Sequence, residues 1–241
     1  VAPLGPVNPE VVESLLFYYA PKRIQRAIPD AWSYATPQAI LEARYIGMDQ
    51  ALKRELGSLV SSEQVMQAAE TVKAAVENID GTGRTLFTGW NALPWPDEPH
   101  LVLWHGCTLL REHRSGCHLI ALAVEELDGP QSVITQVGVD EASAEWIQHE
   151  AGWSHDIVLE ATIKLRDKGW LDEQGHATPS CYEGRARIEK LTDQMNAQHW
   201  TLLGTEKCEQ LASLLGAINS HLPKDDQLDW REIYPKDDMQ N

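Results

Sequence analysis

The chain has 241 residues, 43% of them hydrophobic, and its 36 acidic and 20 basic side chains give a formal net charge of −16 at pH 7. This length and hydrophobic content allow one large core or two smaller ones, and we expect two lobes. The acidic balance argues against a general affinity for nucleic acid, because a negative surface repels phosphate backbones.

The sequence carries no signal for a membrane or for secretion. No stretch reaches the run of about 18 apolar residues that a membrane-spanning helix needs, and the N-terminus lacks the basic and apolar regions of a signal peptide. The four cysteines are scattered without a CxxC pair, which favours reduced thiols. We therefore expect a soluble, cytoplasmic protein without a membrane partner. Position 1 is Val rather than Met, so an upstream segment can be missing from the sequence.

Signals for the starts and ends of helices predict an all-α fold that begins with a helical N-terminal lobe over residues 1–97. Asn8 before Pro9 is an N-cap followed by a favourable first-turn proline, and Thr36 before Pro37 repeats this device. Strand signals are nearly absent, and the apolar residues recur with the period of amphipathic helices.

Residues 98–139 predict central buried helices. A strongly apolar helix begins at Leu101, meets Ser115 and Gly116, where we expect an interruption, and resumes to Leu127. Because this segment is apolar on all sides, it is expected to be buried.

Residues 140–200 predict a winged helix-turn-helix lobe. A short helix near residues 142–151 is followed by Gly152 and by a second helix that Ser154 caps. Beyond the second helix, turn residues 172–175 lie between short segments that predict a minimal β-hairpin, the wing. Residues 201–241 predict a C-terminal helix and an acidic tail.

Three long segments of the chain also occur, with variations, in a known family: APLGPVNPEVVESLLFYYAP (2–21), GRTLFTGWNALPWPDEPHLVLWH (83–105) and GWSHDIVLEATIKLRDKGWLDEQGHATPSCYEGRARIEKLTD (152–193). On these segments the chain resembles a little-characterised actinobacterial family of predicted MarR-like winged helix-turn-helix proteins. The resemblance implies a winged-helix fold and a ligand-responsive transcriptional regulator that binds DNA as a homodimer. The chain departs from the family at Ser115, Gly116 and Cys117, within LLREHRSGCH (109–118), and at Cys181.

The second helix of the predicted helix-turn-helix makes DNA a doubtful partner. Its expected outward positions are Asp156, Leu159, Glu160, Ile163, Lys164 and Asp167. A recognition helix needs donors for bases and phosphates, whereas three of these positions are acidic. Residues 140–200 as a whole carry 12 acidic and 6 basic side chains. The exposed Leu159 and Ile163, one turn apart, instead suggest a protein contact such as a dimer seam.

Candidate catalytic residues lie on the helix over residues 101–118. His105 and Glu112 are seven residues apart and share a helix face, so the carboxylate can orient the imidazole as an acid/base couple with His113 nearby. The alternative is a structural polar network that clamps this buried helix to its neighbours. Only His113 and Cys117 have helical spacing for a shared metal ion, so no metal site is predicted.

The same region suggests a pocket for a small organic ligand. Arg111, Arg114 and His118 could hold an anionic group, and Tyr18, Trp90 and Trp104 could line the cavity, although these aromatic rings can equally belong to the core. The sequence contains no glycine-rich phosphate loop, GxSxG elbow or Cys/His dyad, so no cofactor is predicted.

Two functions follow from these observations. The first is a small-molecule-binding winged-helix protein that has lost DNA binding, with the further option of an enzyme of specialised metabolism. The alternative is a ligand-responsive MarR-like regulator that binds DNA. A homodimer is expected, because Leu211, Leu214, Leu215 and Ile218 give the C-terminal helix an apolar face, although this face can also be buried within one chain.

Overall fold

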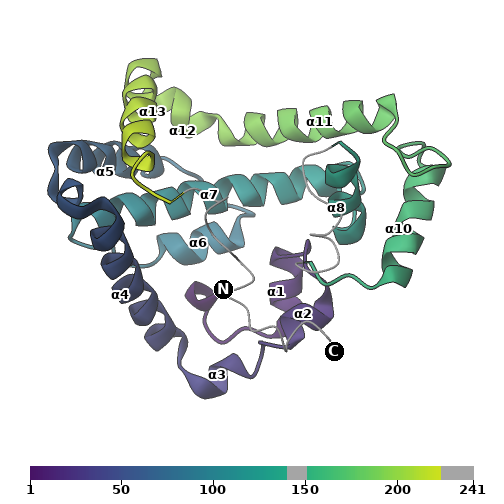
Figure 1. The fold of residues 1–241 in the computed structure, drawn as a ribbon, viewed down its shortest axis with the longest axis horizontal. Helices are drawn as coiled ribbons and strands as arrows, with labels where there is room; N and C mark the ends of the chain where they lie inside the picture. Colours follow the sequence, from purple (N-terminus) through teal and green to yellow (C-terminus); the bar gives the residue numbers. More distant parts are fainter. Residues whose placement is uncertain (140–150, 224–241) are drawn as a thin grey trace. The chain divides into compact units, whose positions relative to one another are not determined.

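The protein was analysed as a computed structural model, which describes residues 1–139 and 151–223 (Figure 1). These residues form twelve α-helices and two 3-10 helices and contain no β-strand, so the all-α prediction is confirmed. The short helix predicted near residues 142–151 falls almost entirely outside the described residues.

The chain divides into two compact units that are each discontinuous in sequence. Unit 1 contains residues 1–40, 81–93 and 111–198, and unit 2 contains residues 41–80, 94–110 and the chain from residue 199. The sequence predicts four consecutive ranges: 1–97, 98–139, 140–200 and 201–241. This division into domains stays a prediction.

Unit 1 contains most of the helices of the described residues. They are η1 (Ala2–Leu4), α1 (Pro9–Leu15), α2 (Pro21–Gln25), α3 (Ala31–Tyr34), α6 (Thr85–Asn91), α8 (Gly129–Gly138), α10 (His155–Asp167) and α11 (Pro179–Asn196). A proline opens α1 at the position that the sequence predicts. A proline also opens α11, where the Thr178 hydroxyl accepts from the Cys181 amide.

The largest core of unit 1 surrounds the predicted helix-turn-helix. It contains Leu122 near the end of α7 (Pro99–Val124), Val133 on α8, Leu165 on α10 and Ile188 on α11, all fully buried. α10 packs against α8. Gly152, just before α10, has φ of +75°, a conformation that a residue with a side chain adopts only at a cost.

Among its described residues, unit 2 contains three long helices and two short ones. They are the main part of α4 (Pro37–Leu56), η2 (Gly57–Ser61), α5 (Glu63–Val76), α12 (Gln198–Leu203) and α13 (Thr205–Asn219). Leu211 and Ile218 of α13 are buried in the core of this unit, with Leu214 and Leu215 packed beside them. The apolar face of the C-terminal helix is therefore covered within its own unit, and the homodimer stays a prediction.

The long helix α7 (Pro99–Val124) passes through both units, with residues up to 110 in unit 2 and from 111 in unit 1. It is continuous, so the interruption predicted at Ser115 and Gly116 is wrong. A Cβ atom on Gly116 would lie 2.7 Å from Cγ of Arg84. The glycine therefore permits a close approach of Arg84 rather than ending the helix.

The predicted β-hairpin wing is also wrong within the described residues. Leu171 and Ala177 form a single isolated antiparallel bridge. Between them the Asp172 carboxylate accepts backbone N–H groups of Gln174 and His176 at 2.9 and 2.8 Å. This side chain holds the loop between the two bridge residues.

Candidate functional site

His105, the first predicted catalytic residue, lies on α7 in unit 2 and is fully buried. Its Nδ1 atom is 2.8 Å from the Tyr45 hydroxyl, and the Trp95 ring meets the imidazole edge to face with centroids 4.8 Å apart. Burial lowers the pKa of His105 to about 4, so the imidazole is neutral at neutral pH.

Glu112 and His113 lie on the part of α7 that belongs to unit 1. Glu112 is 7% exposed and pairs with the neighbouring Arg111 guanidinium. His113 Nδ1 is 2.9 Å from Asn196 Oδ1 and 4.0 Å from Cys117 Sγ. Burial opposes protonation of His113, but its hydrogen bonds with Cys117 and Asn196 raise the pKa above its ordinary value. Because His105 and Glu112 belong to different units, their predicted coupling stays a prediction.

The predicted aromatic residues are likewise divided between the units. Trp90 is buried on α6 in unit 1. Trp104 lies in unit 2, where its ring meets Tyr45 edge to face at 5.2 Å and the Arg44 guanidinium lies 5.2 Å from its centroid. Neither tryptophan lines the cavity described next.

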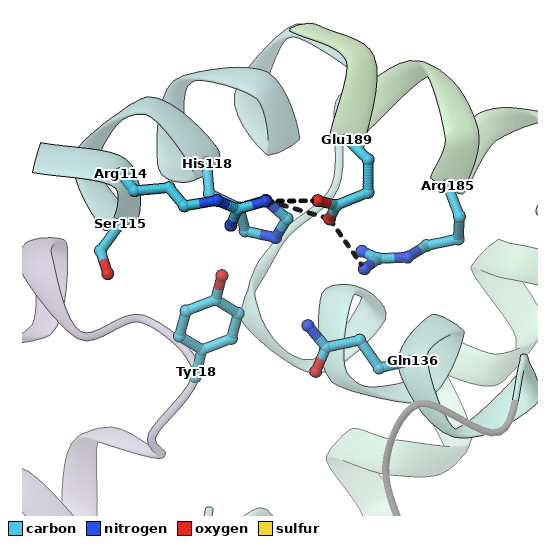
Figure 2. Close-up of a pocket in the computed structure, with 7 residues that line it drawn as sticks. All are labelled: Tyr18, Arg114, Ser115, His118, Gln136, Arg185 and Glu189. Atoms are coloured by element: carbon cyan, nitrogen blue, oxygen red, sulfur yellow. Dashed lines mark hydrogen bonds and ion pairs between the residues drawn. The ribbon is translucent and has the colours of Figure 1, made fainter. Parts of the chain in front are cut away.

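Three of the predicted ligand-binding residues come together in one cavity of unit 1, shown in Figure 2. The cavity has a volume of about 350 Å³ and is lined by Tyr18, Arg114, Ser115, His118, Gln136, Arg185 and Glu189. We call it the Arg114 pocket. Tyr18 follows α1, the next three residues lie on α7, Gln136 lies on α8, and the last two lie on α11.

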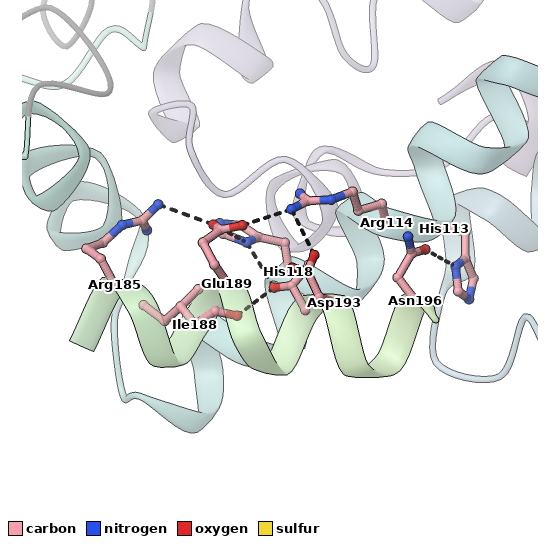
Figure 3. A network of polar contacts seen from close by, with 9 residues as sticks. His113, Arg114, His118, Arg185, Ile188, Glu189, Asp193 and Asn196 are labelled. Atoms are coloured by element: carbon pink, nitrogen blue, oxygen red, sulfur yellow. Dashed lines mark hydrogen bonds and ion pairs between the residues drawn. The ribbon is translucent and has the colours of Figure 1, made fainter. Parts of the chain in front are cut away.

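Glu189 is the centre of the ionic contacts in the Arg114 pocket. Its Oε2 atom accepts a hydrogen bond from Nη2 of Arg114 at 2.8 Å. Its Oε1 atom lies 3.5 Å from Nδ1 of His118 and 3.6 Å from Nη2 of Arg185. The same Nη2 atom of Arg114 also lies 3.5 Å from the exposed Asp193 (Figure 3). One carboxylate thus serves three basic side chains.

The pocket exists because α11 runs antiparallel to the second half of α7 (Figures 1 and 3). His113 bonds to Asn196 near the end of α11. One and a half turns later on α7, His118 Nδ1 lies 3.2 Å from the Thr192 hydroxyl. The Thr192 hydroxyl donates to the Ile188 carbonyl at 2.8 Å, so it accepts from His118, whose proton is therefore on Nδ1.

Tyr18 closes the pocket from the opposite side. Burial raises the pKa of its hydroxyl to about 12, so Tyr18 remains an uncharged donor at neutral pH. The Trp153 indole, just before α10, donates to the Tyr18 carbonyl at 2.7 Å. The backbone of the pocket is thereby tied to the start of the predicted recognition helix.

Ser115, Gln136, Arg185 and Glu189 are pocket residues that the sequence analysis did not identify. One signal for Arg185 was present in the sequence. Helical spacing places it on the same face of α11 as Cys181 and Ile188, both fully buried, and Arg185 is itself only 4% exposed. An arginine on a buried helix face needs an acidic partner, and Glu189 follows four residues later.

The exposed face of α10 agrees with the prediction from periodicity. Ala161 and Leu165 are buried, whereas Asp156, Glu160 and Asp167 are exposed. The exposed apolar positions are Leu159 and Ile163, at 50% and 48%. Lys164 forms an ion pair of 2.8 Å with Glu160, so the lysine offsets part of the negative charge of this face.

Among residues 1–139 and 151–223, no group of three or more His, Cys, Asp and Glu side chains is arranged to hold a metal ion. No helix in this part of the chain has the length and apolarity required to cross a membrane.

Comparison with known proteins gives one result. Neither a curated protein nor a solved structure matched the chain. A family model described as a helix-turn-helix family matches residues 1–228. The chain therefore belongs to this helix-turn-helix family.

Proposed function

We propose that the protein is a transcriptional regulator of the MarR-like helix-turn-helix type that binds DNA as a homodimer, with α10 as the recognition helix. The observation that carries this proposal is the family match over residues 1–228. The arrangement of α10 supports it, because one face packs against α8 while the other is exposed.

The charges on α10 limit the affinity that this helix can supply. Its exposed acidic side chains repel the phosphate backbone of DNA. The basic side chains near its C-terminal end are Lys164, Arg166 and Lys168. Lys168 and Arg166 already donate to the Glu125 and Asp172 carbonyls, at 2.8 and 3.1 Å. Specific binding must therefore come from a few contacts and from pairing of two copies.

The test is fluorescence anisotropy with the gene's own upstream DNA and a scrambled duplex of the same composition. We expect tighter binding to the native duplex, weaker binding of the Lys164→Gln variant, and no change for Lys207→Gln, an exposed lysine on α13. Equal binding of the two duplexes, or none, would overturn the proposal.

A second candidate is favoured by the three exposed acids of α10. In this alternative the protein binds a small organic molecule and has lost DNA binding. Neutralising Asp156, Glu160 and Asp167 together separates the candidates. If α10 enters a groove, the Asp156→Asn, Glu160→Gln, Asp167→Asn variant binds DNA more tightly than the wild type, because repulsion is removed. If neither protein binds DNA, the second candidate is supported.

A further inference from the structure

The Arg114 pocket is unusual within this acidic chain because cationic and neutral donors converge there from four separate segments. Arg114 and Ser115 come from α7, Arg185 from α11, Gln136 from α8, and Tyr18 from the segment after α1. Figure 2 shows the Tyr18 hydroxyl and the Gln136 amide facing the space beside the row formed by Arg114, Glu189 and Arg185.

The balance of charge around the cavity favours an anion. Arg114 and Arg185 both line it, and among the described residues of the lining Glu189 is the single acid. Asp193 also approaches Arg114, but its side chain is 70% exposed and its charge is therefore strongly screened by water. The contact of Arg185 with Glu189, at 3.6 Å, is longer than a hydrogen bond. The lining thus holds two guanidinium groups against one carboxylate.

The donors match a carboxylate better than a compact point charge. A guanidinium presents parallel N–H groups that fit the two oxygens of a planar carboxylate. The protonated Tyr18 hydroxyl and the Gln136 amide add neutral donors at the same cavity. A volume of about 350 Å³ leaves room for a small organic body beside the carboxylate. Phe17, which is not a lining residue, stacks on Tyr18 with centroids 4.9 Å apart and supports that ring from outside the cavity.

We propose that the Arg114 pocket binds a small organic carboxylate. The carboxylate lies between the Arg114 and Arg185 guanidinium groups, and the Tyr18 hydroxyl donates to it. The proposal is independent of whether α10 binds DNA, and it gives the second candidate function a site and a ligand class. Because Gln136 and Arg185 lie on the helices packed around α10, the ligand joins elements of the helix-turn-helix core.

The experiment uses the whole chain and three probe acids: acetate, succinate and benzoate. Calorimetric titration and thermal unfolding are measured at constant ionic strength, with benzamide as the neutral match of benzoate and with inorganic phosphate. We expect at least one of the three carboxylates to bind and to raise the unfolding temperature, and benzamide to do neither.

The variants locate the site. Arg114→Gln should fold, since the arginine side chain is 45% exposed, and should lower the affinity at least tenfold. Glu189→Gln should raise the affinity, because it removes the carboxylate that competes for the same donors. The matched control is Arg187→Gln on the same helix, whose ion pair with Glu125 lies outside the pocket lining, and it should bind as the wild type does.

Several results would overturn the proposal: absence of binding by all three acids, binding that Arg114→Gln leaves unchanged, benzamide binding as tightly as benzoate, or phosphate binding more tightly than every carboxylate. None of these readouts involves DNA, so this proposal and the DNA proposal can fail separately.

Discussion

The two halves of α7 show how neighbouring groups decide the charge of an ionisable side chain. In unit 2, His105 lies against Tyr45 and Trp95 and is held neutral by burial. In unit 1, the continuation of the helix carries Arg114, whose side chain is 45% exposed and whose guanidinium pairs with the carboxylate of Glu189 on α11. A side chain on this helix therefore keeps its charge where a facing helix supplies a group of opposite charge. It becomes neutral where aromatic rings surround it.

The largest effect expected from this comparison is a pH dependence due to His105. Its pKa is about 4 in the folded protein, against an ordinary value of 6.5. As the pH falls from about 6.5 to about 4, the unfolded chain takes up a proton that the folded protein refuses, so the free energy of unfolding falls. The contribution is up to about 3 kcal/mol. Urea unfolding at several pH values measures it.

Subtracting the pH profile of a His105→Gln variant isolates this contribution, because the other titrating groups are common to both proteins. Above pH 7 the difference between the two profiles should be flat. A difference that also stays flat between pH 6.5 and 4 would mean that water reaches the imidazole, and the contrast between the halves of α7 would be lost.

A smaller effect is expected in the charged half of α7. Glu189→Gln removes the carboxylate that lies 3.6 Å from Nη2 of Arg185, a residue that is 4% exposed. Breaking a buried pair costs about 3–5 kcal/mol and an exposed pair about 0–1 kcal/mol. Glu189 is 38% exposed, so we expect a loss of about 2 kcal/mol in the free energy of unfolding.

Chemical unfolding of this variant is compared with that of Glu206→Gln, an exposed glutamate on α13, which should change the stability by less than about 0.5 kcal/mol. Equal stability of the two variants would show that Glu189 is not needed as a counter-charge, and that the arginines are compensated by other means.

The features that the sequence predicted correctly are local ones. Proline after Asn8 and Thr36 starts α1 and α4 because the preference is set within one turn of the chain. The exposed and buried faces of α10 follow from helical period alone. Gly116 was misread because a glycine can signal either a helix end or a close approach, and only the position of Arg84 distinguishes these.

The Arg114 pocket could be predicted only in part. Arg114 and His118 stood out as ionisable groups on an apolar helix, but their partner Glu189 lies more than 70 residues away. Which residue of α11 faces which residue of α7 depends on the packing of the whole unit, and no local pattern encodes this pairing. The division of His105 and Glu112 between two units escaped prediction for the same reason, since helical spacing alone suggested that they could pair.

The smallest effect concerns the hydroxyl of Tyr45. Removing it tests whether a hydrogen bond or burial keeps His105 neutral. Tyr45→Phe removes the partner at 2.8 Å from Nδ1 but keeps the ring, so we expect a loss of about 1 kcal/mol in the free energy of unfolding. This loss should be the same at pH 7 and pH 5, because burial rather than the hydroxyl lowers the pKa of His105. The control is Tyr34→Phe, whose ring is 88% exposed and whose change should be negligible. If the loss shrinks markedly at pH 5, the hydroxyl itself donates to Nδ1 and holds the imidazole neutral, and the aromatic half of α7 would then depend on a specific hydrogen bond just as the charged half does.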